Sequence, residues 1–262
     1  MKLRSMSIAW CLACAVAPAC AHDTWFQVLP AVPGARLLAL GSGNRYPVQE
    51  TGVGAQFLAR QGCSLDGRQA LMQALRNESH ALVLKAGPMA QSCWAQLVPL
   101  EIELPASKVA IYLREIQAPA EVRAAWTRLQ EQGLPWRETY TKHARIDFSP
   151  ARGTAAPMAM DIVWEPAAPG GLTFRVLRDG TPLAGLAMEL QSDAASLGIW
   201  RRSDAEGRIH VNALPAGRWV LRGTDLRTAS SDAQRWQSHF VTLAFDVPAP
   251  AGTLDSAAAL QR

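Results

Sequence analysis

The first half of the chain shows the short-period pattern that is typical of β-strands. Apolar and polar residues alternate, or form short apolar runs, in DTWFQV, RLLAL, HALVLKA and SCWAQLVPLEIEL. Turn signals of the Pro-Gly, Gly-Ser-Gly-Asn and Asp-Gly kind separate these segments. The pattern predicts an antiparallel β-domain over residues 22–149.

The apolar period lengthens to that of a helix between residues 107 and 132. Four apolar residues recur at helical spacing behind Ser107, a potential cap: Val109, Tyr112, Leu113 and Ile116. A second set follows Pro119, which suits the first turn of a helix, and precedes Gly133, which suits its end: Val122, Ala125, Trp126 and Leu129. We expect two helices, inserted in the β-domain and packed against its sheet.

The remainder of the chain predicts a second β-unit. Residues 150–160 have the composition of a linker, and alternation resumes behind them. Short strands with regular turns and no helical pattern predict a β-sandwich over residues 161–247. Residues 248–262 are rich in small side chains and predict a flexible tail. The fold class expected from this pattern is mostly β.

The first 21 residues predict a secretory signal peptide. Two basic residues precede a short apolar segment, and Ala19-Cys20-Ala21 fits the small-residue rule for cleavage. Lipoprotein processing before Cys20 is the alternative, but Ala17 stands where a lipobox usually has Leu, Val or Ile. We therefore favour a free periplasmic protein that begins at His22 over a lipid-anchored one.

The net charge and the hydropathy of the chain argue against nucleic-acid binding and against a membrane-spanning segment in the mature chain. The formal charge of +4 falls to +2 with the leader, which carries two basic residues and no acid. This surplus is too small to predict nucleic-acid binding. Behind the leader no segment is apolar for long enough to span a membrane.

Two cysteines remain in the mature chain, Cys63 and Cys93. In an exported protein they predict a disulfide, which would contribute about 3 kcal/mol by closing a loop of this length. A thiolate metal pair is the alternative reading.

Four passages together resemble a known bacterial family: the leader running into AHDTWF, ETYTKHARI, GTPLAG…RRSDAEGRIHV…GRWVLRG, and WQSHFVTLAFDV. They are similar to the nickel-transport family, catalogued as a domain of unknown function and described as the periplasmic component of ABC-type cobalt/nickel uptake. Mature chains of that family typically begin with His, an acidic residue, one further residue and Trp, which here are His22, Asp23, Thr24 and Trp25.

The resemblance covers nearly the whole mature chain, and it carries expectations about fold and role. It implies that the C-terminal sandwich is of the carboxypeptidase-regulatory or transthyretin type. It also implies a role in binding or handing over Ni²⁺ or Co²⁺, with a membrane metal permease as a possible partner.

The candidate metal ligands are the histidines in these passages. His22 at a processed terminus would offer its α-amine and a ring nitrogen together as a chelate. His143 and His239 lie in strand-like segments, His143 on the more polar face of its strand. Asp23 is a further candidate, as a carboxylate ligand or as a partner that orients a ring. No local spacing motif exists, so distant segments would have to form the site, which would suit nickel or cobalt and also copper.

We expect no enzyme, because the chain lacks Gly-x-Ser-x-Gly, His-Glu-x-x-His and a Gly-rich phosphate loop. The sequence thus favours a periplasmic metal-binding accessory protein. One alternative is a non-catalytic β-sandwich module that binds a glycan or a partner protein. Another is a copper enzyme with a histidine brace, in which His143 or His239 would join His22.

Overall fold

A computed structural model describes residues 22–30, 32–149, 154–167 and 171–249. The predicted signal peptide, part of the predicted linker and most of the predicted tail lie outside these residues. Within them the fold is mostly β, as predicted, with two α-helices and three sheets.

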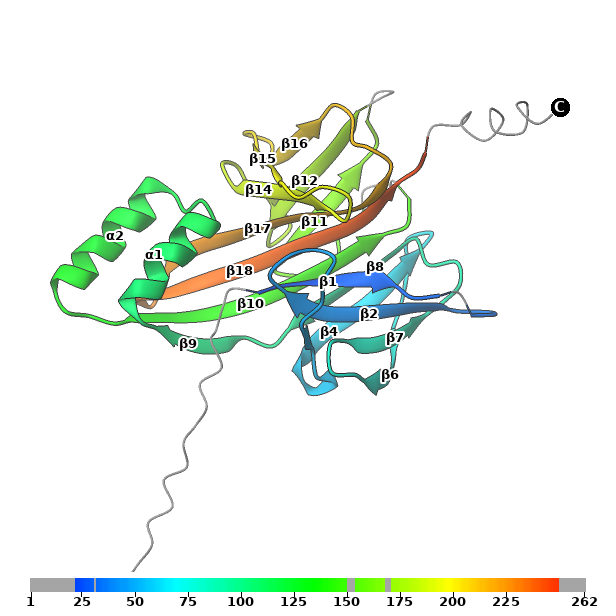
Figure 1. The fold of residues 1–262 in the computed structure, drawn as a ribbon, viewed down its shortest axis with the longest axis horizontal. Coiled ribbons are helices and arrows are strands. Elements are labelled where there is room, and N and C mark those ends of the chain that lie inside the picture. The colour runs from blue at the N-terminus through cyan, green and yellow to red at the C-terminus, as the bar shows by residue number, and fades with distance from the viewer. Residues whose placement is uncertain (1–21, 31, 150–153, 168–170, 250–262) are drawn as a thin grey trace, which may run out of the picture.

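Among the described residues the sheets have five, nine and four strands (Figure 1). The five-stranded sheet contains β1 (Asp23–Val28), β2 (Arg36–Gly43), β3 (Thr51–Gly52), β6 (Gln73–Asn77) and β7 (Leu82–Ala86). The nine-stranded sheet contains β4 (Leu58–Leu65), β5 (Arg68–Ala70), β8 (Ser92–Leu97), β9 (Leu100–Leu104), β10 (Trp136–Asp147), β14 (Ala187–Ser192), β15 (Ile199–Arg202), β17 (Gly217–Ala229) and β18 (Asp232–Val247). The four-stranded sheet contains β11 (Met160–Glu165), β12 (Leu172–Arg178), β13 (Thr181–Pro182) and β16 (Arg208–Val211).

The nine-stranded sheet runs across both units that the sequence predicts. Strands β10 and β18 pair in parallel, with Thr141 opposite His239 and His143 opposite Val241. Strand β18 also pairs with β17 in a long antiparallel ribbon (Figure 1). The predicted boundary at residues 150–160 lies behind β10 and reaches the first residue of β11. Strands from both sides of it share one sheet. The division of the chain into two domains stays a prediction.

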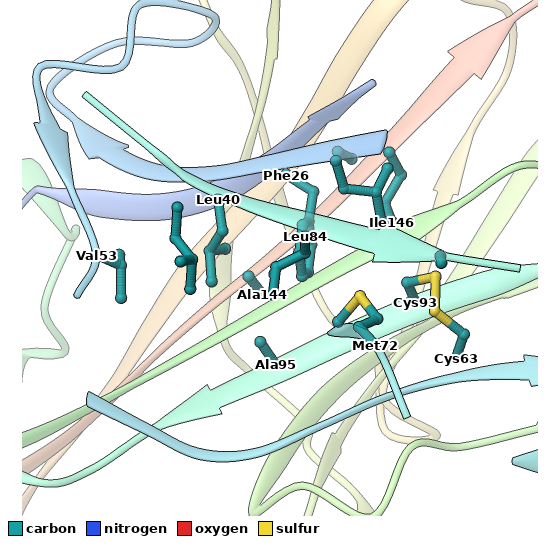
Figure 2. Packing of buried hydrophobic residues seen from close by; sticks show 14 of the residues in the cluster. Phe26, Leu40, Val53, Cys63, Met72, Leu84, Cys93, Ala95, Ala144 and Ile146 are labelled. Atoms are coloured by element: carbon teal, nitrogen blue, oxygen red, sulfur yellow. A yellow bond between two sulfur atoms is a disulfide. The ribbon is translucent and has the colours of Figure 1, made fainter. Parts of the chain in front are cut away.

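One face of this central sheet packs against the five-stranded sheet. Ala144 and Ile146 of β10 join Phe26, Leu40 and Leu84 of the other sheet in one apolar cluster (Figure 2). The same cluster holds the predicted disulfide between Cys63 and Cys93, which are partners in the β4–β8 register and are drawn as the yellow bond of Figure 2. The disulfide prediction is confirmed.

The opposite face packs against the four-stranded sheet. Val241, Leu243 and Phe245 of β18 form an apolar cluster with Ile162 of β11 and Phe174 of β12. Because successive side chains of a strand point to opposite faces, Ala144 and Ile146 of β10 face one sheet, while Val241, Leu243 and Phe245 of β18 face the other.

A buried ion cluster adds to this second interface. Arg145 Nε donates to Asp147 Oδ1 at 2.7 Å, and Arg145 Nη1 donates to Asp161 Oδ2 of β11 at 2.8 Å. The three side chains are at most 2 % exposed.

The predicted helices occur as α1 (Ala106–Glu115) and α2 (Ala120–Glu131). They cover one end of the long strands (Figure 1), above the stacked rings of Trp136 and Trp236, whose centroids are 4.5 Å apart. The prediction that Ser107 caps this helix is wrong. Helix α1 begins at Ala106, so the cap position is Pro105, which makes no side-chain hydrogen bond to the helix. Neither helix of the described part is long and apolar enough to cross a membrane.

Candidate functional site

His22 lies directly before β1, next to a carboxylate from the segment behind β2. Its Nε2 is 3.6 Å from Oε2 of Glu50, and the two side chains are 21 % and 39 % exposed. Glu50 is itself held in place, because its backbone N–H donates to Ser42 O at 2.8 Å and Asn44 Nδ2 donates to its carboxylate at 3.1 Å. The Nδ1 atom of His80 lies 3.0 Å from the backbone oxygen of Glu50.

This contact determines which ring nitrogen of His22 is available. A carboxylate beside Nε2 favours the tautomer with hydrogen on Nε2, which leaves the lone pair on Nδ1. Nδ1 is the nitrogen close enough to its own backbone to chelate a metal together with a terminal α-amine. Glu50 was missed by sequence reasoning, because a lone Glu in a loop carries no signal that pairs it with His22.

Asp23, the second candidate in the same segment, has a structural partner. Its side chain is buried and ion-paired with Arg222 of β17. Arg222 Nη2 also lies 2.6 Å from Oε2 of Glu189. The Asp23 carboxylate therefore anchors β1 to the central sheet and is already engaged by a guanidinium.

His143 and His239 lie together, in the interface with the four-stranded sheet. Their ring centroids are 5.3 Å apart with an interplanar angle of 23°. Both side chains are buried, and Nδ1 of His143 lies 3.0 Å from Phe240 O. Within the described ranges, Nε2 of His143 and both ring nitrogens of His239 have no hydrogen-bond partner.

Burial makes this pair weakly basic. The pKa of His143 is lowered to about 3 and that of His239 to about 4, and desolvation is the largest cause of both shifts. The positive charge of Arg178 contributes to both. The pair is therefore neutral at physiological pH.

The central sheet separates this pair from His22. His22 lines a cavity together with Lys142 and Phe240, whose side chains point to the face opposite to that of His143 and His239. The structure thus brings together two of the three candidate histidines and leaves the third on the other side. No three His, Cys, Asp or Glu side chains of the described part form a group that could hold a metal ion.

The cavity beside His22 has a volume of about 110 Å³ and lies between α1 and the strands β9, β10 and β18. Its walls are largely apolar, with Ile102, Leu104, Ile111 and Phe240.

A buried carboxylate, that of Glu138, also contributes to the cavity wall. It accepts hydrogen bonds from Tyr112 Oη at 3.0 Å, from Trp136 Nε1 at 2.8 Å and from the hydroxyl of Ser238. Burial raises the pKa of Glu138, and the three hydrogen bonds oppose this rise.

Comparison with known proteins gives no family for this chain. No protein-family model matches it, and no curated protein matches it significantly.

Proposed function

We propose that this chain is a periplasmic protein that binds one divalent late transition metal through the α-amine and Nδ1 of His22, as an accessory to nickel or cobalt uptake. The observation that carries the proposal is the Glu50 carboxylate 3.6 Å from Nε2 of His22. Histidines that bind metals commonly direct their other ring nitrogen toward a carboxylate, which fixes the tautomer and orients the ring. The proposal depends on cleavage after Ala21, because only a terminal His22 has a free amine.

The donor set suits a metal that is carried and released. An amine and an imidazole are ligands for Ni²⁺, Co²⁺ and Cu²⁺, and together they occupy two coordination positions. The remaining positions are open to water or to a donor from another molecule. Binding displaces a proton from the amine, whose ordinary pKa is about 8, so little free energy is lost near neutral pH.

The link to a membrane metal permease rests on the resemblance to the nickel-transport family. The same resemblance supports a finer description of the fold, in which the C-terminal unit is a sandwich of the carboxypeptidase-regulatory or transthyretin type. Face-to-face packing of β11, β12 and β16 against β14, β17 and β18 supports this description.

The two alternative functions find less support in the geometry. A histidine brace needs a second imidazole beside the terminal one, and His143 and His239 lie on the other face of the sheet. A glycan-binding platform needs exposed aromatic rings. Among the described tryptophans, however, seven are buried: Trp25, Trp94, Trp126, Trp136, Trp164, Trp219 and Trp236.

The test is a calorimetric titration of the chain that begins at His22 with Ni²⁺, Co²⁺ and Cu²⁺. A matched chain with one additional N-terminal Ala keeps the imidazole but moves the amine away from it. We expect one equivalent of metal to bind the first chain, and binding at least tenfold weaker to the second. Equal binding by both chains, or binding by neither, would refute the proposal.

A further inference from the structure

The cavity beside His22 contains a cation that the protein does not neutralise. Lys142 of β10 lines this cavity and is half-buried. Within the described ranges its ammonium forms no ion pair, and its Nζ lies 5.8 Å from the centroid of the Tyr140 ring. An ammonium removed from water without an anion costs free energy, so a partner of opposite charge would be favoured there.

The pKa of Lys142 is consistent with an ammonium that lacks a nearby anion. The pKa of Lys142 is lowered to about 8, because burial lowers it by more than the negative charge of Asp23 raises it. Asp23 is ion-paired with Arg222, and its charge is therefore shared.

The other charged groups of the cavity do not supply the missing anion. The carboxylate of Glu138 accepts three hydrogen bonds from within the protein, and among the described residues it forms no ion pair with Lys142. Lys108 and Glu115 are exposed on α1, so water solvates their charges. Lys142 is left as the half-buried cation of the cavity, without an ion-pair partner among the described residues.

The walls would accept an apolar body next to that charge. Phe240 packs between two tyrosine rings, with centroid distances of 6.3 Å to Tyr112 and 6.2 Å to Tyr140. Ile102 and Ile111 line the cavity from β9 and α1. Apolar walls with a few convergent polar or charged groups are typical of a small-molecule site.

We propose that this cavity binds a small organic monocarboxylate, whose carboxylate pairs with Lys142 and whose apolar body packs against Phe240 and Ile111. The volume of about 110 Å³ approaches the roughly 150 Å³ of an engineered cavity that holds benzene. A single ammonium matches one negative charge, whereas a phosphate monoester, with nearly two charges, is more often held by the fork of an arginine. This site needs no metal and goes beyond the function proposed for His22.

The probe for this site is benzoate, titrated into the chain that begins at His22 in buffer with EDTA, and followed by calorimetry or by NMR shifts. Hexanoate tests an aliphatic body, and benzyl alcohol tests the need for the charge. Lys142→Gln removes the cation, and Lys142→Arg restores it. The exposed Lys85 of β7 provides the matched control Lys85→Gln.

We expect a Kd of about 1 mM or tighter for benzoate or hexanoate. Binding is expected to be at least tenfold weaker for benzyl alcohol and for Lys142→Gln. Lys142→Arg should regain part of the affinity, and Lys85→Gln should keep all of it. If Lys142→Gln fails to fold, Ile111→Trp replaces it, because Ile111 is 39 % exposed on the cavity side of α1 and a larger side chain there should block binding.

Two results would overturn the proposal: no binding of either carboxylate at about 20 mM, or unchanged binding by Lys142→Gln. If Lys142→Gln does not fold, unchanged binding by Ile111→Trp overturns it instead. Since EDTA is present throughout, failure here is independent of the outcome of the metal titration.

Discussion

The imidazole of His143 on β10 stacks on that of His239 on β18, with 5.3 Å between the ring centroids. The two residues are almost one hundred positions apart in the chain, and the parallel pairing of their strands brings them together. Both rings are buried and lack full hydrogen bonding within the described residues. Protonation of either ring would therefore place a charge in the core and lower the free energy of unfolding.

The first prediction concerns the pH dependence that His239 gives to stability. Burial, with the charge of Arg178, holds the folded-state pKa of His239 at about 4, whereas the ordinary value is about 6.5. The unfolded chain therefore binds this proton first, and stability falls as the pH drops from about 7 toward 4. At pH 5 this loss amounts to about 2 kcal/mol.

The variant His239→Phe, which keeps an aromatic ring but cannot titrate, isolates this effect. We expect the stability of the variant relative to the native chain to increase by about 2 kcal/mol between pH 8 and pH 5. Urea denaturation at both pH values measures it. The exposed His210 provides the control variant His210→Phe. A relative stability of His239→Phe that is the same at both pH values would show that His239 is protonated alike in the folded and unfolded chain.

The second prediction concerns the buried charges between β10 and β11. Arg145→Met would leave Asp147 and Asp161 buried without their cation, which typically costs about 3–5 kcal/mol. Arg76→Met, in an exposed ion pair with Glu78, should cost less than about 1 kcal/mol. Chemical denaturation of both variants compares them. Similar losses of unfolding free energy in the two variants would mean that the buried ion cluster stabilises the fold no more than an exposed ion pair does.

The third prediction concerns the disulfide. It joins Cys63 and Cys93 across 30 positions of sequence, and removing it frees that loop in the unfolded chain. The double variant Cys63→Ser/Cys93→Ser is therefore expected to lose about 3 kcal/mol, relative to the native chain. Reduction of the native protein should give a similar loss in denaturation experiments. If neither the double variant nor the reduced protein loses stability, the disulfide does not stabilise the fold by constraining the unfolded chain.

Local patterns predicted the elements of the fold well. The alternation in DTWFQV corresponds to β1, and the helical spacing after residue 107 corresponds to α1 and α2, because period and turn residues act over a few positions. The alternation also placed His143 on a polar face with Arg145. The sequence did not reveal that this face is buried, since Asp161 and the four-stranded sheet that cover it come from later segments.

The arrangement of the site depends on non-local pairing, which sequence periodicity does not determine. The parallel register of β10 and β18 places His143 and His239 on the face opposite to that of Phe240 and the cavity of His22. Glu50 reaches His22 only because β1 and β2 pair and the chain turns back behind β2.

The last prediction concerns the role of Glu50 in the proposed metal site. If its carboxylate orients the ring of His22, Glu50→Gln should weaken binding of Ni²⁺ or Co²⁺ by about 10- to 100-fold, as is typical when such a partner is lost. The fold should be retained, because the Glu50 side chain is 39 % exposed. Glu78→Gln, another exposed glutamate of the same unit, is the matched control. Calorimetric titration of the three chains that begin at His22 gives the affinities. An affinity that Glu50→Gln leaves unchanged, with metal still bound through the terminal amine, would assign the site to His22 alone and remove Glu50 from it.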